Sequence, residues 1–292
     1  MVAYRRRRVQ GRDVFYREAG DPAAPTLVLL HGYPSSSFMF RQLIPALEDQ
    51  LHLIAPDYPG FGNSDAHRPP SSSIPSTPSP RSWRDCSTTW ASSGSGSTSR
   101  TTAPPRHPHR DRRPDAIQAV IVQNGNAYEG LSPAWAPLRD GLWRQRTAET
   151  GQLVIEASIN PERIKANWTA GARDPEGLSP DGWNMDRYFM TQPHRRQIQL
   201  ELLYDYRHNL ARYPEFQVFL RHHRPPVLIV WDEQDPYFTV ADSAGVSARP
   251  ARCRAAPAAD RPLRPRGAGA HCRPGPGLYA ASAQPAAIAA GQ

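Results

Sequence analysis

Cysteine and lysine are scarce in this 292-residue chain, and long apolar runs are absent. The three cysteines show no C-x-x-C spacing, which argues against a disulfide framework or a zinc site and favours an intracellular protein. No apolar run reaches about 18 residues, the length that crosses a bilayer. The arginine-rich N-terminus is not followed by the apolar segment of a signal peptide. We therefore expect a soluble cytoplasmic protein with no membrane partner.

Proline is abundant but unevenly distributed. The chain has 32 prolines and only 39% hydrophobic residues, a balance typical of a globular protein with unstructured stretches. Two segments, 66–114 and 243–292, hold sixteen of the prolines and all three cysteines. Each carries a net charge of +6, so the remainder of this +8 chain is −4. The basic character belongs to these two segments, which argues against a nucleic-acid partner.

The rest of the chain alternates between short apolar runs and helical patterns. Five runs predict strands, some apolar enough to be buried on both faces of a parallel sheet: 13–19, 26–30, 51–56, 117–123 and 226–231. An amphipathic helix is expected around 39–48, and the polar, aromatic-rich region from Tyr128 to His223 predicts a helical insertion. Residues 71–105 show no period and almost no apolar content, which is typical of a linker.

Two motifs follow the second and third of these strands. The first is His31-Gly32-Tyr33-Pro34, which is either a tight turn or a functional strand end. The second is DYPGFGNSD at 57–65, whose glycines permit backbone angles closed to other residues, and we assign Asp57 a role in that turn. In this order, H-G-x-P and D-x-P-G-x-G-x-S resemble the motifs of α/β-hydrolases with a mobile cap, in the epoxide-hydrolase and haloalkane-dehalogenase branch.

The resemblance implies an α/β fold with a mostly parallel central sheet and a helical cap. In this family the backbone N–H of the residue after His-Gly, here Tyr33, forms half of the oxyanion hole. Tyr33 also stands where many dehalogenases carry a halide-binding asparagine. That difference favours epoxide chemistry, or another ester-like reaction, over dehalogenation.

A third motif, WDEQDP at 231–236, stands where the family carries W-G-x-x-D-P. Asp235 matches the acid that orients the catalytic histidine, and the alternative is a turn or N-cap aspartate. Asp232 replaces the family's glycine. Glu129 is a second candidate for the acid, because some relatives place it after the strand at 117–123.

The predicted insertion contains YDYRHN at 204–209, which is similar to a cap segment of epoxide hydrolases. There the family keeps a tyrosine that donates a hydrogen bond to the epoxide oxygen. Tyr206 is the best match. The alternative is an aromatic residue that only packs on its helix.

The family's nucleophile elbow and catalytic histidine are not visible, and no G-x-S-x-G occurs. A shifted reading frame in a GC-rich gene would explain why both features are missing, and the other frame can restore them. Back-translated from its third base, Ser99–Pro104 can read Gln-Asp-Tyr-Gly, with the aspartate at the Arg100/Thr101 junction. Back-translated from its second base, Arg261–Gly267 can read Gly-His-Phe-Ala-Leu-Glu, with the histidine at the Pro262/Leu263 junction. The alternative is a natural linker and tail. In either case we expect the sheet to lack its middle strand and 91–105 to form none.

These observations predict three parts: an N-terminal core at 1–127 with 66–114 out of frame, a cap at 128–223, and a C-terminal core at 224–292 with 243–292 out of frame. The intended enzyme opens an epoxide in a small apolar substrate through an aspartyl ester and needs no cofactor or metal. The chain as written is expected to be inactive. The alternatives are a haloalkane dehalogenase-like hydrolase, a non-catalytic binding protein, or a basic arm on nucleic acid, although residues 91–114 lack the aromatic residues that would support the last.

Overall fold

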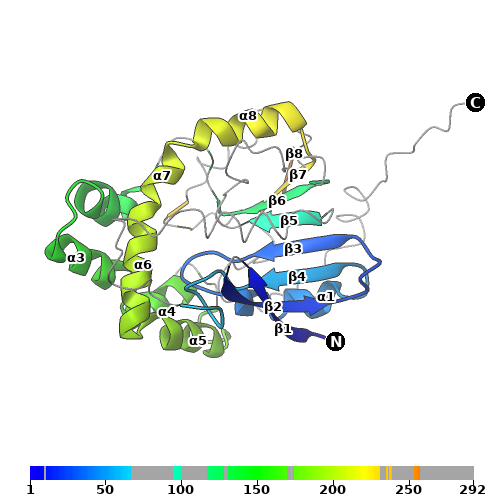
Figure 1. Cartoon of the computed structure of the whole chain (residues 1–292), viewed down its shortest axis with the longest axis horizontal. Helices are drawn as coiled ribbons and strands as arrows, with labels where there is room; N and C mark the ends of the chain where they lie inside the picture. The colour runs from blue at the N-terminus through cyan, green and yellow to red at the C-terminus, as the bar shows by residue number, and fades with distance from the viewer. Residues whose placement is uncertain are drawn as a thin grey trace, which may run out of the picture.

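The computed structural model describes residues 1–9, 11–66, 95–99, 117–125, 127, 131–169, 172, 174–230, 235, 237–238 and 253–256. Residues 95–99 and 253–256 are described by their backbone alone. Within these ranges one sheet runs through the molecule, and most of the helices gather beyond one end of it (Figure 1).

The sheet has eight strands in the order β1-β2-β4-β3-β5-β6-β7-β8. Their bounds are β1 Ala3–Val9, β2 Arg12–Ala19, β3 Thr26–Leu30, β4 His52–Pro56, β5 Ser95–Ser99, β6 Val120–Gln123, β7 Val227–Val230 and β8 Cys253–Ala256. The pairs β1–β2 and β2–β4 are antiparallel, and every other pair is parallel. The predicted mostly parallel sheet is confirmed. Each of the five predicted strand runs contains most or all of an observed strand.

Strand β5 contradicts the expectation that 91–105 forms no strand, and β8 lies in the other segment that is predicted to be out of frame. Strand β5 fills the middle of the sheet, where it pairs with β3 on one side and β6 on the other, and β8 pairs with β7. Main-chain N–H and C=O groups form such ladders whatever the side chains are, and neighbours with unpaired edges favour an added strand. The expectation that the sheet lacks its middle strand is therefore wrong.

Strand β1 was not foreseen either, because its sequence is AYRRRRV. It forms the edge of the sheet and pairs with β2 alone. Four consecutive charged side chains are tolerated there because they reach solvent on both faces. Charge on an edge strand also hinders pairing with other molecules.

The helix expected around 39–48 is divided in two: the 3-10 helix η1, Ser37–Phe40, and α1, Leu43–Leu47. Pro45 lies in the first turn of α1. A continuous helix would bring Pro45 into its interior, where the ring removes a hydrogen bond and clashes with the preceding turn. Both short helices pack with β3 and β4 around a core that includes Leu29, Ile44 and Leu53.

The region between β6 and β7 is helical. Its helices are η3 Pro133–Trp135, the π-helix η4 Pro137–Leu142, α3 Ala148–Ser158, α4 Pro161–Thr169, α5 Asp181–Met190, α6 Pro193–Asp205, α7 Arg207–Leu210 and α8 Tyr213–His223. Figure 1 shows α3 to α6 on the side of the sheet to which β3 and β5 point. Helices α6 and α7 follow one another directly, with a break at Tyr206.

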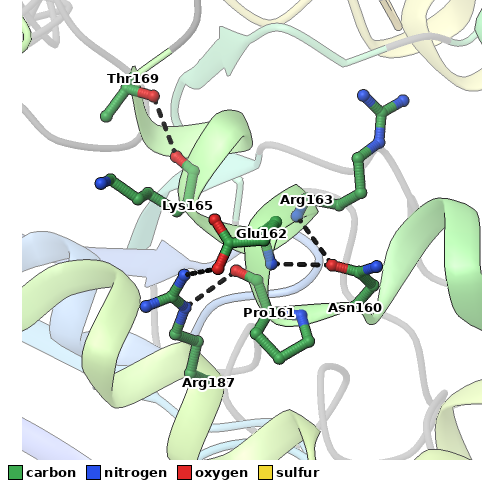
Figure 2. A network of polar contacts seen from close by, with 7 residues as sticks. All are labelled: Asn160, Pro161, Glu162, Arg163, Lys165, Thr169 and Arg187. Carbon is green, nitrogen blue, oxygen red and sulfur yellow. Dashed lines mark hydrogen bonds and ion pairs between the residues drawn. The ribbon is translucent and has the colours of Figure 1, made fainter.

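Helices α4 and α5 are joined by polar contacts at the start of α4 (Figure 2). Asn160 caps α4, because its Oδ1 accepts the backbone N–H groups of Glu162 and Arg163 at 2.8 and 3.3 Å. From α5, Arg187 donates to the Pro161 carbonyl at 2.8 Å and to the Glu162 carboxylate at 3.0 Å. These contacts hold the two helices as a pair.

Candidate active site

Several parallel strands end at one edge of the sheet, and the predicted motif residues follow them there. Parallel ladders join β3 to β4 and β5, and join β6 to β5 and β7, so the carboxyl ends of all five strands share this edge. His31 follows β3, Asp57 follows β4, Asn124 follows β6 and Asp235 lies beyond β7. Open α/β sheets bind ligands outside the carboxyl ends of their strands. This edge is the candidate active site.

His31 bridges the loops after β3 and β4. Its side chain is buried, its Nε2 accepts the backbone N–H of Tyr58 at 3.0 Å, and its Nδ1 lies 3.0 Å from the Gly32 carbonyl oxygen. Desolvation by burial lowers the pKa of His31, and the nearby Asp57 carboxylate and the Gly32 contact oppose this only in part. The ring is therefore neutral near pH 7. The sequence showed His31 as a motif residue but carried no sign of this bridge.

Asp57 organises the loop that follows β4. Its carboxylate is fully buried and accepts two backbone N–H groups, that of Ser37 at 2.7 Å and that of Asn63 at 2.8 Å. Its own carbonyl accepts the Ser64 hydroxyl at 2.6 Å. Gly62 has a φ of +47°, and a Cβ there would lie 2.1 Å from Asp57 Oδ2. The turn role predicted for Asp57, and the reason for a glycine beside it, are confirmed.

Helix α6 holds the same loop from the other side. Gln199 donates to the Gly60 carbonyl at 2.9 Å, and the Arg195 guanidinium reaches the carbonyl oxygens of Gly60 and Ser64 at 3.4 and 3.5 Å. Both side chains are buried, and desolvation lowers the pKa of Arg195. More than 130 positions separate these partners. Sequence reasoning missed both residues because nothing local marks them.

Tyr33 lies half-buried where two apolar clusters meet. Its ring packs against the cluster that contains Trp135 and Phe238 and also against the one that contains Phe61 and Trp168. The rings of Tyr33 and Phe61 are 6.2 Å apart and nearly perpendicular. The predicted oxyanion role of the Tyr33 backbone N–H stays a prediction.

Tyr206 stands at the C-terminal end of α6, within a group of stacked rings. Its ring lies 5.1 Å from that of Trp135 and 6.4 Å from that of Trp143, nearly parallel to both. Trp143 in turn donates its indole N–H to the Leu203 carbonyl of α6 at 2.9 Å. This packing holds the phenol ring of Tyr206 in one orientation. Its predicted role as a donor stays a prediction.

Asp235 forms a turn beyond β7. Its Oδ1 accepts the backbone N–H groups of Tyr237 at 2.8 Å and Phe238 at 3.1 Å. The Tyr237 carbonyl accepts the indole N–H of Trp135 at 3.1 Å, which ties this turn to the ring that stacks on Tyr206. One carboxylate oxygen thus makes the turn that was the alternative to a catalytic role. The same bonds orient the carboxyl group, so the two roles are compatible.

Two predicted residues and a neighbour of the third therefore meet around one apolar cluster. Tyr33, Tyr206 and Tyr237, which lies two residues beyond Asp235, all pack against the cluster that contains Trp135 and Phe238, although they come from the β3 end, α6 and the β7 end. Glu129, Asp232 and the two frame-shift junctions lie outside the described residues.

Neither a metal site nor a membrane-spanning helix is present among the described residues. In this part of the chain, no group of three or more His, Cys, Asp or Glu side chains is arranged to hold a metal ion. No helix in the described ranges has both the length and the apolar content needed to cross a bilayer.

Comparison with known proteins places this geometry in a family. A family model described as alpha/beta hydrolase fold matches residues 25–90. The "Uncharacterized hydrolase YNR064C" of Saccharomyces cerevisiae is 33% identical over 244 residues, covering 79% of this chain and 80% of that protein. A shorter match joins the chain to "Epoxide hydrolase A" of Mycobacterium tuberculosis, 48% identical over 48 residues, covering 16% of this chain and 15% of that protein.

A solved structure shows the same fold. The haloalkane dehalogenase DbeA from Bradyrhizobium elkani superposes with a TM-score of 0.61. The alignment covers 87% of this chain and 89% of that one at 18% identity. At this identity the likeness establishes the architecture and leaves the reaction open.

Proposed function

Because the chain belongs to the α/β-hydrolase fold family, we propose that its site is that of an epoxide hydrolase-like enzyme working through an aspartyl ester. We further propose that the chain as written is inactive, since frame shifts have replaced the nucleophile and the general base. We infer a small apolar substrate, which the aromatic side chains gathered around Trp135 support, and a reaction that requires no cofactor or metal.

The register of β5 is the observation that carries this proposal. Ser99, the last residue of β5, pairs with Leu30, the last residue of β3. The chain therefore leaves β5 level with the start of the H-G-Y-P loop. The Arg100/Thr101 junction, where the alternative frame can encode an aspartate, follows directly in the sequence. An attacking carboxylate there would be adjacent to the Tyr33 amide that is proposed to stabilise its ester.

The sequence of β5 also supports a shifted frame. A strand paired on both sides within a parallel sheet is usually apolar, yet β5 reads SGSTS. In the frame that yields the aspartate, each codon consists of the third base of one printed codon followed by the first two bases of the next printed codon. A TCN serine codon then becomes NTC, which encodes phenylalanine, leucine, isoleucine or valine. With TCN codons, Ser95, Ser97 and Ser99 would all become apolar, as the central place of β5 requires; AGT or AGC codons would not give this result.

The first chemical step opens the epoxide. A carboxylate oxygen of the restored aspartate attacks an epoxide carbon, the carbon–oxygen bond breaks, and the departing oxygen takes a proton from the Tyr206 hydroxyl. The product is an ester between the enzyme and the opened substrate. The rings of Trp135 and Trp143 hold the Tyr206 phenol in place for this donation.

The second step hydrolyses the ester. The restored histidine removes a proton from water, the resulting hydroxide attacks the ester carbonyl, and the tetrahedral oxyanion is stabilised by the Tyr33 N–H. Collapse of that intermediate breaks the ester bond, and the departing alkoxide takes the proton of the aspartic acid and leaves as the diol. The proton held by the histidine returns to the Tyr206 oxygen through water, so the aspartate, the histidine and Tyr206 all regain their starting states. Asp235 orients the histidine and stabilises its charged form.

Two further functions remain as alternatives. A haloalkane dehalogenase would share the ester route and release halide in the first step, and the fold is common to such enzymes. A non-catalytic binding protein would use the aromatic cluster without any nucleophile. Turnover of haloalkanes with no reaction on epoxides would favour the dehalogenase. A single intact reading frame in the native gene would favour the binding protein.

Two experiments test the proposal. Sequencing of the coding DNA around residues 66, 113 and 243 should reveal the frame changes. A single uninterrupted reading frame there would overturn the proposal that frame shifts removed the catalytic residues. The chain with both frames restored should hydrolyse a small apolar epoxide, whereas the printed chain should show no turnover above background.

Matched variants of the restored chain separate the candidate acids. Asp235→Asn should lower turnover strongly because the histidine loses the partner that orients it, and Glu129→Gln should not. The opposite pattern would assign the acid to Glu129. Tyr206→Phe should slow ester formation while leaving ester hydrolysis unchanged.

A further inference from the structure

We propose that His31 is the positioning residue of the oxyanion hole: its Nδ1–H fixes the Gly32–Tyr33 peptide plane and thereby aims the Tyr33 N–H. This inference rests on the proposed function. The contact that carries it is the 3.0 Å approach of Nδ1 to the Gly32 carbonyl oxygen, which adds to the bond that the same oxygen accepts from the Ser35 N–H at 3.1 Å within the turn. That carbonyl belongs to the same peptide group as the Tyr33 N–H. In a trans peptide the two bonds point in opposite directions, so holding one fixes the other.

The second bond of the ring determines which nitrogen carries the proton. The backbone N–H of Tyr58 can only donate, so the His31 Nε2 it meets at 3.0 Å must accept with its lone pair. In a neutral imidazole the hydrogen then resides on Nδ1, where it donates to the Gly32 carbonyl. The loop after β4 therefore sets the tautomer that holds the loop after β3.

The surroundings of His31 keep this arrangement neutral and rigid. The ring is buried, with ring centroids of Tyr58 and Phe61 at 4.5 and 5.1 Å. Desolvation lowers the pKa of His31, so the imidazole stays uncharged although the Asp57 carboxylate is near. Protonation would remove the lone pair that receives the Tyr58 N–H.

The support extends to α6. Gln199 and Arg195 bond the Gly60 carbonyl, two residues beyond Tyr58, and Asp57 holds the loop from within. A chain of contacts thus runs from α6, through the loop after β4, to His31 and the Tyr33 amide. The helix that ends at Tyr206 and the donor at Tyr33 are positioned against the same loop.

A buried histidine could instead serve packing alone, and two variants distinguish the roles. His31→Asn retains an amide N–H near the place of Nδ1 but no acceptor for Tyr58. His31→Gln can present an acceptor near Nε2 but no donor to Gly32. If His31 positions the peptide, only the asparagine variant should preserve the Tyr33 amide.

The first measurement needs no catalysis. In the full printed chain labelled with ¹⁵N, long-range nitrogen spectra should show His31 as the Nδ1–H tautomer, with protonation only below the ordinary value of 6.5 because burial lowers its pKa. The His31→Asn amide spectrum should keep the Tyr33 signal and shift that of Tyr58, and His31→Gln should do the reverse. A ring that titrates at or above its ordinary pKa, an Nε2–H tautomer, or equal shifts of Tyr33 in both variants would overturn the proposal, and so would an unfolded chain.

The second measurement uses the restored enzyme. Loss of one oxyanion donor typically slows catalysis about 100-fold or more. We expect His31→Gln to lower kcat for ester hydrolysis by about 10-fold to 100-fold with little change in KM, and His31→Asn to recover most of it. An equal loss in both variants would contradict a positioning role. If the restored protein neither turns over an epoxide nor forms an ester when its catalytic histidine is replaced by glutamine, while the His31 spectra are as expected, the proposed function is refuted and the positioning of the peptide is not.

Discussion

Removal of the Asp57 carboxylate should destabilise the protein strongly, although Asp57 has no predicted catalytic role. The side chain is fully buried and accepts the Ser37 N–H at 2.7 Å and the Asn63 N–H at 2.8 Å. Ser37 begins η1, whereas Asn63 lies in the loop after β4. In Asp57→Ala both N–H groups lose their acceptor at once.

The two N–H groups should contribute unequally. The Ser37 residue is fully buried, so its N–H would remain without a partner, at a cost of about 1–3 kcal/mol. Asn63 is exposed and its N–H can turn to water, which limits that loss to about 1 kcal/mol. We expect the free energy of unfolding to fall by about 2–4 kcal/mol.

Urea unfolding followed by tryptophan fluorescence measures this change. Asp21→Ala is the matched control, because exposed Asp21 also accepts a backbone N–H, that of Ala23 at 2.9 Å. The control should lose less than about 1 kcal/mol, since water replaces the acceptor. If Asp57→Ala and Asp21→Ala lower stability equally, Asp57 does not organise this loop.

Three further changes test the same region. Gly62→Ala should destabilise far more than Gly11→Ala in urea unfolding: both glycines have positive φ, but only the Gly62 Cβ would strike Asp57, and Gly11 has open space. Because burial lowers the pKa of His31, the unfolded chain takes up that proton first as pH falls. Stability should therefore decrease below the ordinary value of 6.5, and His31→Gln should flatten this part of the pH dependence of the urea midpoint. Trp168→Phe removes the 2.9 Å bond to buried Asp186 and should cost about 1–2 kcal/mol, detectable as a lower melting temperature than that of Trp183→Phe.

The apolar strands and the glycine loop could be read from the sequence because their signals are local. LVLL at 27–30 and VLIV at 227–230 are apolar runs, buried or half-buried along their length, and they can be recognised without knowledge of their neighbours. The D-x-P-G-x-G-x-S loop could also be recognised, because the residues that determine its backbone conformation lie within the motif itself. Gly62 is required by the carboxylate five residues before it.

Other features depend on partners far along the chain. Strand β5 has no apolar periodicity, and its place follows from the unpaired edges of β3 and β6. Buried Arg195 and Gln199 look like ordinary exposed helix residues in sequence, because their carbonyl partners lie in a loop more than 130 positions earlier. The bridging role of His31 required the Tyr58 N–H to be located.

Intact-protein mass spectrometry tests the central claim most directly. In the chain with both frames restored, the histidine at the Pro262/Leu263 junction would be replaced by glutamine, which stops water activation but leaves the nucleophile. Incubation with a small apolar epoxide should then raise the protein mass by the mass of that epoxide, and digestion should place the adduct on the peptide that follows β5. A folded restored protein that gains no mass from any epoxide or haloalkane would contradict the aspartyl-ester account.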